Sequence, residues 1–386
     1  MSFSRRGFLR TLTAGTVVGS LSSWPGGTLA AASTLAAGSG HDPLVRDHEG
    51  FLLLDSNENV YGPSAKVMAA AGESLKRANR YPHREYGALT EDIAHLHKVQ
   101  TSQILLACGS TDLLRVAAAA LVTPGKKALT AAPTFEDLAM YSKAIGAEVV
   151  TVPLTAKFEH DLEAMLARID SATALVYICN PNNPTASITP RADIETFLSK
   201  LPPSVYVLID EAYHHYVNPS ARYVSFLDKP TANNNVLVLR TFSKIYGMAG
   251  LRLGYAVANP HLLEKMRPLL TDVDLNCAAV AAGRAALADT ESARNFVKRN
   301  ADDRQEFFNQ AMARMLKPID SHANFVMMDA HQPADDVIEH FLENKVRIGR
   351  HFPPMKHHIR VSLGTRSAMD EFWRVWDLLP RSKMAM

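Results

Sequence analysis

The sequence predicts an α/β fold built on a mostly parallel central sheet, with a smaller α/β unit toward the C-terminal end. Short apolar runs rich in β-branched residues alternate with helical patterns from residue 104 onward, which is typical of a parallel sheet covered by helices on both faces. Polar turn motifs follow several of these runs, and ligands in such sheets bind at the carboxyl ends of the strands. A chain of 386 residues is long enough for two packed units.

The strands are predicted from apolar and β-branched runs, and turn residues separate them from the helices. Two strands are predicted to end near residues 54 and 132. The other predicted strands span residues 104–108, 147–153, 174–179, 205–210, 236–240, 256–259, 323–328, 346–349 and 359–363. The predicted helices span residues 64–78, 113–122, 161–169, 191–201, 334–344 and 370–379, with a helical region after 259 that continues through 316. The turn GSTD at 109–112 is expected to cap the helix that follows and to expose backbone N–H groups as an anion site.

The composition is that of an ordinary globular protein, with 47% hydrophobic and 21% charged residues. A net charge of +2 gives no strong electrostatic attraction to nucleic acid or to an acidic membrane. The three cysteines lack metal-ligand spacing, and Cys108 and Cys179 are predicted to be buried thiols, although one disulfide stays open. Adjacent histidines diverge in direction, so the two His-His pairs of the chain are not predicted to bind a metal.

Residues 1–40 are predicted to be a targeting segment rather than part of the fold. Residues 4–10 read SRRGFLR, a twin-arginine motif, and the run 11–24 that follows is too short and too polar for a transmembrane helix. Three alanines at 30–32 offer a small-residue cleavage site. We therefore expect export by the twin-arginine (Tat) route to a periplasmic or other extracytoplasmic location, with no stable membrane insertion after signal removal. Two alternative interpretations stay open: an uncleaved signal that anchors the protein, and a chance arginine pair on a cytoplasmic protein.

Residues 241–255, TFSKIYGMAGLRLGY, hold the strongest catalytic candidate of the chain, Lys244. Lys244 follows the apolar strand 236–240, and a lysine at the end of a buried strand is poorly solvated, so its amine is easier to deprotonate. A neutral amine is what a Schiff-base lysine requires. Ser243 and Arg252 supply a hydroxyl donor and a cationic fork, which together suit a phosphate.

Other strand ends also carry polar motifs. Residues 132–135 read APTF, residues 180–185 read NPNNPT, and Asp210 begins the sequence DEAY. Two prolines among three asparagines make 180–185 a rigid turn. A polar segment, LDSNENVYGP, also follows the first strand at 54–63.

In this order, the motifs resemble those of the pyridoxal-phosphate (PLP) aminotransferases of fold type I, class I/II, and most of all the histidinol-phosphate aminotransferase group. The resemblance covers the chain from about residue 54 to its end. It implies PLP (pyridoxal 5'-phosphate) as the cofactor and a fold type I PLP transferase architecture. It also implies a large PLP-binding domain over 75–285, a small α/β domain formed by 41–74 and 286–386, and a homodimer with shared active sites.

The resemblance assigns roles to the residues around the cofactor ring. Lys244 would be the Schiff-base lysine. Asp210 would keep the pyridine nitrogen protonated, so that the ring acts as an electron sink. Asn183 and Tyr213 would hydrogen-bond the phenolic oxygen, and Phe135 would stack on the ring in a place where many relatives have tyrosine.

The resemblance also assigns the phosphate and substrate contacts. The cofactor phosphate would be held by Ser110, Thr111, Ser243, Arg252 and, from the neighbouring subunit, Tyr81. Arg360 would grip the substrate carboxylate, Tyr61 would face the substrate, and Arg350 would be the second substrate arginine, with Arg347 as the competing candidate. Two features depart from the family's pattern: the asparagine turn ends in Ala186 where glycine is usual, and residues 352–355 read FPPM.

The expected activity is that of a PLP-dependent transaminase, which moves an amino group between an amino acid or amino-alcohol phosphate and a 2-oxo acid. A PLP-dependent decarboxylase or lyase, such as a threonine-phosphate decarboxylase, is the alternative because it shares nearly all of these motifs. A non-catalytic binding protein of the same fold is disfavoured by the full residue set. The sequence leaves the donor open, because an exported enzyme fits amino-acid biosynthesis poorly.

Overall fold

The structure is a computed structural model that describes residues 46–218, 220, 222–231, 233–271 and 275–380. These residues belong to one compact unit, residues 41–386. The predicted targeting segment, 1–40, lies outside the described residues. Within the described ranges, no helix is both long enough and apolar enough to cross a membrane.

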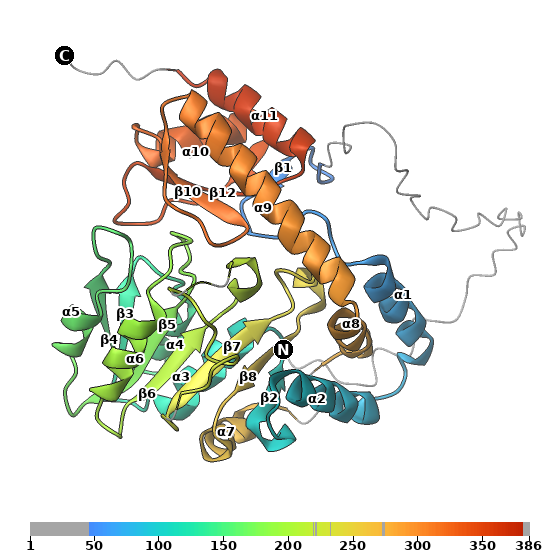
Figure 1. Ribbon diagram of the computed structural model, residues 1–386, viewed down its shortest axis with the longest axis vertical. Coiled ribbons are helices and arrows are strands. Elements are labelled where there is room, and N and C mark those ends of the chain that lie inside the picture. The colour runs from blue at the N-terminus through green and yellow to red at the C-terminus, as the bar shows by residue number, and fades with distance from the viewer. Residues whose placement is uncertain (1–45, 219, 221, 232, 272–274, 381–386) are drawn as a thin grey trace, which may run out of the picture. The chain divides into compact units, whose positions relative to one another are not determined.

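The central sheet has seven strands, and it confirms the predicted mostly parallel arrangement (Figure 1). In spatial order the strands are β2 (Ile104–Ala107), β8 (Gly254–Val257), β7 (Val236–Thr241), β6 (Tyr206–Asp210), β5 (Thr173–Cys179), β3 (Lys127–Ala132) and β4 (Glu148–Pro153). β8 alone in this sheet runs against the others, since it pairs antiparallel with both β2 and β7 while the other pairings are parallel.

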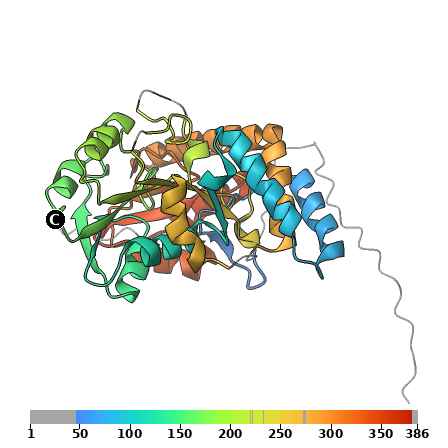
Figure 2. The ribbon, with the colours of Figure 1, turned by 90° about the horizontal axis from the view of Figure 1, so that it is seen from below.

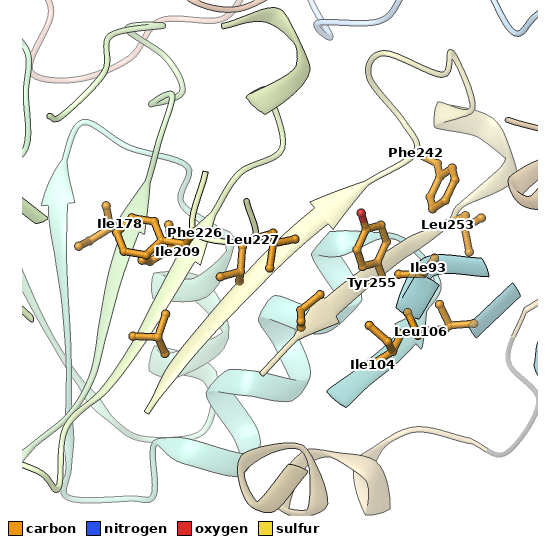
Figure 3. Packing of buried hydrophobic residues seen from close by; sticks show 14 of the residues in the cluster. Ile93, Ile104, Leu106, Ile178, Ile209, Phe226, Leu227, Phe242, Leu253 and Tyr255 are labelled. Carbon is orange, nitrogen blue, oxygen red and sulfur yellow. The ribbon is translucent and has the colours of Figure 1, made fainter. Parts of the chain in front are cut away.

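Helices cover both faces of this sheet, because successive strand residues point to opposite sides and both sides are apolar. One face packs against α1 (Ala65–Ser74), α2 (His83–His97), α5 (Leu162–Leu166), α6 (Arg191–Ser199) and α8 (Cys277–Ala288). The other packs against α3 (Ser110–Leu121), α4 (Asp137–Ala144) and α7 (Pro260–Met266). Viewed from below, the strands lie between these helices (Figure 2). Figure 3 shows part of the first core, where Ile178 and Ile209 of neighbouring strands lie side by side.

A second core forms from the C-terminal part of the chain together with the first strand. It contains α9 (Thr290–Ala313), β9 (Lys317–Pro318), β10 (Phe325–Asp329), α10 (Ala334–Glu343), β11 (Val346–Ile348), β12 (His358–Ser362) and α11 (Arg366–Asp377). β1 (Leu52–Leu54) pairs in parallel with β11, so Leu52 and Leu54 are buried in this core with Phe341 and Phe372. The expected division into a large and a small domain stays a prediction.

The single-turn helices lie at element ends and connections: η2 (Leu75–Arg77), η3 (Thr101–Gln103), η4 (His214–Tyr216), η5 (Ala249–Leu251) and η6 (Arg267–Leu269). The sequence analysis named no helix where α2 and α4 lie. α2 buries only Leu89, Ile93 and Ala94, so its apolar stripe is narrow. α3 begins at Ser110, earlier than the predicted residue 113, and the three cysteines are free thiols, of which Cys179 is buried and Cys108 partly exposed.

Candidate active site

The polar motifs that follow the strands meet at one edge of the central sheet. The six parallel strands end there, and β8 begins there because it runs in the opposite direction, which brings Arg252 to the same edge as Lys244. A cavity of about 300 Å³ lies at this edge, and we call it the inner cavity. The predicted residues that line it are Ser110, Thr111, Phe135, Asn183, Asp210, Tyr213, Ser243, Lys244, Arg252 and Arg360.

Lys244 lies just beyond the end of β7, with its amine held by the backbone of the segment after β1. Nζ donates to the carbonyl oxygens of Asn57 at 3.0 Å and Ser56 at 3.3 Å. Burial lowers the pKa of Lys244 to about 8, with a further lowering by the positive charge of Arg360. An appreciable fraction of the amine is therefore neutral near pH 7, and a neutral amine can act as a nucleophile or a base.

Asp210 ends β6 and is only 3% exposed. Its Oδ2 accepts a hydrogen bond from the Tyr177 hydroxyl at 3.0 Å, and its Oδ1 accepts one from the Ala212 N–H at 3.0 Å. Burial raises the pKa of Asp210 to about 6, although both hydrogen bonds act to lower it. A buried carboxylate of this kind is stabilised as an anion by a cationic partner, such as a protonated ring nitrogen.

Tyr213 and Asn183 both line the inner cavity. The Tyr213 hydroxyl accepts a hydrogen bond from Asn57 Nδ2 at 3.0 Å, and the centre of its ring lies 5.7 Å from Lys244 Nζ. Burial raises the pKa of Tyr213 above its usual range, so the phenol keeps its proton and can donate it in a hydrogen bond. Asn183 is 7% exposed, and its Oδ1 accepts from Arg360 Nη1 at 2.7 Å.

An anion cradle forms where α3 begins, beside the start of β8. A Cβ on Gly109, whose φ is +85°, would lie 2.5 Å from Arg252 Nη2, and a Cβ on Gly254 would lie 2.4 Å from the Ser110 nitrogen. Only glycine at these two positions lets the guanidinium and the helix N-terminus approach each other. Backbone N–H groups, the Ser110 and Ser243 hydroxyls and the Arg252 guanidinium together suit a phosphate.

The inner cavity therefore has the chemistry that PLP requires. Phosphate-binding donors lie at the α3 end, a carboxylate lies on β6, and a poorly solvated amine lies at the end of β7. Phe135 adds an aromatic side chain to the wall. The residues present fit an aromatic ring that carries a phosphate, a basic nitrogen and a carbonyl group.

Arg360 lies between the inner cavity and a larger cavity of about 740 Å³, which we call the outer cavity, and it lines both. It is 8% exposed, and besides its bond to Asn183 it donates from Nη2 to the Asp55 carbonyl oxygen at 2.5 Å. Its Nε is buried and has no hydrogen-bond partner among the described residues. Burial lowers the pKa of Arg360 to about 10, so it stays a cation at neutral pH with a donor to spare for an anion.

Both candidates for the second arginine line the outer cavity. Arg350 donates to Glu136 Oε2 at 2.5 Å, and Arg347 donates to Glu49 Oε2 at 3.1 Å. The positive charge of Arg350 contributes to the lowered pKa of Arg360. Arg350 is therefore the candidate whose charge reaches the inner end of the outer cavity.

Two predicted residues are not brought to either cavity within this chain. Tyr61 lies over α9, where its hydroxyl donates to Asp303 Oδ2 at 2.9 Å and the Arg299 guanidinium lies 4.8 Å from its ring centre. Tyr81 is 78% exposed. Their assigned roles at the substrate and at the phosphate of a neighbouring subunit stay predictions.

Asn57 and Tyr177 contact the predicted site residues but were not among the candidates. Asn57 bonds Tyr213 with its side chain and Lys244 with its carbonyl oxygen, and its φ of +53° is a conformation that asparagine tolerates better than most residues. It lies in the LDSNENVYGP segment, whose polar cluster could have pointed to it. Tyr177 looked like one more apolar strand residue, because its hydroxyl becomes relevant only when the register of β5 against β6 is known.

The turn at 180–186 has alanine in a left-handed conformation, at the position where glycine is usual in the family. Ala186 is fully buried with φ of +59°, and its N–H donates to the Asn182 carbonyl oxygen at 2.7 Å. The left-handed conformation explains why glycine is usual here, since alanine there costs about 1–2 kcal/mol. As for metals, the described residues contain no group of three or more His, Cys, Asp or Glu side chains that could hold an ion.

Comparisons with known proteins agree with this geometry. The family described as "Aminotransferase class I and II" matches residues 49–375. The chain is similar to a histidinol-phosphate aminotransferase of Moorella thermoacetica, with 35% identity over 83% of both chains. It is also similar to histidinol-phosphate aminotransferase 1 of Nitrosococcus oceani, with 37% identity over 86% of this chain and 90% of the other.

Solved structures give the same picture. A putative histidinol-phosphate aminotransferase from Erwinia carotovora atroseptica superposes with a TM-score of 0.80 and 32% identity, over 86% of this chain and 95% of the other. The histidinol-phosphate aminotransferase of Sinorhizobium meliloti, solved in complex with pyridoxal-5'-phosphate, superposes with a TM-score of 0.79 and 26% identity, over 85% and 91%.

Proposed function

The chain belongs to the aminotransferase class I and II family, and on that premise we propose which amino group it moves. It is a PLP-dependent transaminase of the histidinol-phosphate aminotransferase type. We propose that its amino donor is an amino-alcohol phosphate of the histidinol phosphate class, and that its acceptor is a 2-oxo acid. The relatives named above support this donor class, and the alternative of a decarboxylase becomes an outcome of the test.

One observation carries the proposal: Arg360 lies where the inner and outer cavities meet, buried, cationic and with a free Nε–H. A phosphate or carboxylate bound there brings the carbon that carries the amino group of the donor toward Lys244. The side chain of the donor then extends into the outer cavity. Its volume of about 740 Å³ leaves room for an imidazole or a larger group.

The chain's own residues perform the proton transfers. When bound, PLP supplies an electron-withdrawing ring that stabilises negative charge on the carbon that carries the amino group. Lys244 would hold the cofactor covalently, and its Nζ would be the base that takes a proton from this carbon and later returns one. Asp210 would balance the charge of a protonated ring nitrogen, and the protonated hydroxyl of Tyr213 would donate a hydrogen bond to the cofactor. Arg360 orients the donor through its anionic group.

We assign Arg350 as the second substrate arginine. Its charge acts on Arg360, and its ion pair with Glu136 is exposed, with 54% and 60% of the two side chains accessible. An exposed ion pair contributes little stability, so an anionic substrate group can replace Glu136 as the partner of Arg350.

We also propose a homodimer in which Tyr81 of each subunit reaches the phosphate site of the other. The high exposure of Tyr81 supports this, because a large aromatic side chain left in solvent is a candidate for an interface. A dimeric mass in solution and a several-fold weaker retention of PLP in Tyr81→Ala are expected. A monomeric active enzyme would contradict the proposal.

Export by the Tat route is a further proposal and rests on the SRRGFLR motif. Residues 1–39 fused to a reporter should carry it out of the cytoplasm. Changing both Arg5 and Arg6 to Lys should keep the reporter inside. Export that persists in the double-lysine variant would contradict the Tat assignment.

The donor assignment is tested by a panel of amines with 2-oxoglutarate as acceptor. Histidinol phosphate should give a kcat/KM at least about tenfold above that of histidinol, because only the phosphate ester can engage both arginines. Equal values for the two would contradict the donor class. Release of CO2 with the oxo acid unused would instead identify a decarboxylase.

A further inference from the structure

We infer that Tyr177 is a positioning residue for the cofactor: its hydroxyl holds the Asp210 carboxylate as an anion and fixes its orientation for a protonated ring nitrogen. The inference rests on the PLP cofactor and not on the proposed donor. Tyr177 does not line the inner cavity, so it acts through Asp210.

The register of two neighbouring strands creates the contact. On β5 and β6, Tyr177 lies opposite Leu208 and Cys179 lies opposite Asp210. Because side chains alternate along a strand, Tyr177, Cys179 and Asp210 share one face of the sheet, and Tyr177 is the diagonal neighbour of Asp210. A diagonal neighbour is within reach of an aromatic side chain but not of a short one. The Tyr177 hydroxyl therefore reaches the carboxylate from the sheet side, at 3.0 Å.

Each of two hydrogen bonds engages a different oxygen of the Asp210 carboxylate. Tyr177 occupies Oδ2, and the Ala212 N–H occupies Oδ1. Each carboxylate oxygen can accept more than one hydrogen bond, so acceptor capacity is left for a partner in the cavity. With both oxygens held, the plane of the carboxylate is fixed before the cofactor arrives, and pre-organisation of this kind reduces the cost of binding.

The Tyr177 hydroxyl is also the side-chain donor that stabilises the negative charge of Asp210. Asp210 and Tyr177 are both buried, and burial alone favours the neutral acid. Burial raises the pKa of Tyr177 well above its usual value, so the phenol stays neutral and only donates. The other ionisable groups that act on or face Asp210 are Cys179 of β5, Glu211, Asp137 of α4, Tyr213 and Lys244. Glu211 is tied to Arg240 and Ser225, and the Cys179 thiol donates to the Pro181 carbonyl oxygen, so neither supports the Asp210 charge.

Loss of the hydroxyl has a defined chemical consequence. In Tyr177→Phe the ring still fills its space, but Oδ2 loses its donor inside an apolar core. The carboxylate then takes up a proton more readily, and a protonated Asp210 cannot balance the charge of a protonated ring nitrogen. The defect should grow as the pH falls, because a raised pKa of Asp210 in the variant means that more of it is protonated at a given pH.

The test measures the dissociation constant of pyridoxal 5'-phosphate for purified apoprotein, by fluorescence quenching, in wild type and Tyr177→Phe. We expect binding about tenfold weaker in the variant at neutral pH. The ratio of the two constants should increase from about pH 8 to about pH 6. An unchanged constant, or a ratio that does not depend on pH, would overturn the inference.

A matched control separates this role from simple packing. Tyr216 is also buried, at 4% exposure, and its hydroxyl has no hydrogen-bond partner among the described residues. Tyr216→Phe removes the same atom from a similar environment. It should leave the affinity for pyridoxal 5'-phosphate within about twofold of wild type, since no hydrogen bond is lost. A tenfold loss in this control as well would show that the measurement reports packing.

A double-mutant cycle gives the decisive readout. If Tyr177 acts through the charge of Asp210, then Tyr177→Phe should change the affinity by less than about twofold in an Asp210→Asn background. Fully additive losses in the double variant would show that Tyr177 acts independently of Asp210 and would overturn the inference. Thermal unfolding of the four proteins verifies that each is folded.

Discussion

The inner and outer cavities share Arg360 but differ in how their charged groups are held. In the inner cavity Asp210 and Arg360 are 3% and 8% exposed, and burial shifts the pKa of Lys244 to about 8 and that of Asp210 to about 6. In the outer cavity the pairs Arg350–Glu136 and Arg347–Glu49 have side chains that are 40–60% exposed. The predicted catalytic groups are thus the more buried ones, while the outer pairs are exposed and can exchange partners.

This difference predicts that substitutions in the inner cavity abolish the reaction, whereas those in the outer cavity change the choice of substrate. The largest effect is expected for Lys244→Ala, because it removes the amine that lies between the two carbonyl oxygens of the segment after β1. Turnover should fall by about 10³-fold or more. Steady-state assays with added PLP measure it.

A surface lysine provides the control for that variant. Lys66 is exposed and pairs with Asp289, outside both cavities. Lys66→Ala should keep kcat/KM within about twofold of wild type. If Lys244→Ala were as active as Lys66→Ala, the inner cavity would not be the catalytic site.

Arg360→Lys tests a charged residue that lines both cavities. A lysine keeps the charge but loses the planar fork that bonds Asn183 and the Asp55 carbonyl while presenting Nε. We expect kcat/KM to fall by about 100-fold with little change in the affinity for PLP. Arg374→Lys, on the exposed face of α11, is the matched control. A loss of PLP affinity equal to the loss of kcat/KM would show that Arg360 acts through cofactor binding and not through the substrate.

The lowered pKa of Lys244 predicts the pH dependence of cofactor uptake. Only the neutral amine attacks a carbonyl, so the uptake rate should rise with pH and level off above about pH 8. An ordinary lysine would show a rate that still climbs about tenfold per pH unit there, because its pKa is about 10.4. Stopped-flow absorbance of apoprotein mixed with PLP distinguishes the two profiles.

Smaller, substrate-dependent effects are expected in the outer cavity. Arg350→Gln should lower kcat/KM for phosphorylated donors by about three- to tenfold and leave uncharged donors unchanged. Arg347→Gln, which breaks the comparable pair with Glu49, should have an effect below about twofold. The reverse order of effects would make Arg347 the second substrate arginine.

The smallest effect is expected for a substitution in the turn at 180–186, whose Asn183 lines the inner cavity. Ala186→Gly relieves a left-handed alanine but removes a buried methyl group and adds freedom to the unfolded chain. These contributions oppose each other, so the free energy of unfolding should change by less than about 1 kcal/mol. Urea denaturation measures it, and a larger change in either direction would show that the turn is not held as described.

The difference between the inner and outer cavities also explains which parts of the site the sequence could predict. The sheet, its direction and the meeting of Lys244, Asp210 and Asn183 in the inner cavity were predictable, because these residues lie at or just beyond the ends of strands that meet at one edge. Tyr177 was not, because a tyrosine inside an apolar strand becomes a partner of Asp210 only through the β5–β6 register.

Arg347 and Arg350 stayed undecided for a related reason. Arg350 contacts the β3–α4 connection and Arg347 contacts Glu49 before β1, and no local pattern specifies either long-range contact. α2 escaped prediction because so little of its surface is apolar. The roles of these residues depend on long-range contacts, which their identity and their neighbours in the sequence do not specify.

The central claim is that Lys244 is the attachment point of PLP within reach of the Asp210 carboxylate. Borohydride reduction of the PLP-loaded protein, followed by peptide mapping, tests it most directly. The account predicts a single modified lysine, Lys244, and loss of the modification in Lys244→Ala. Modification of a different lysine in the wild-type protein, or of none, would contradict it.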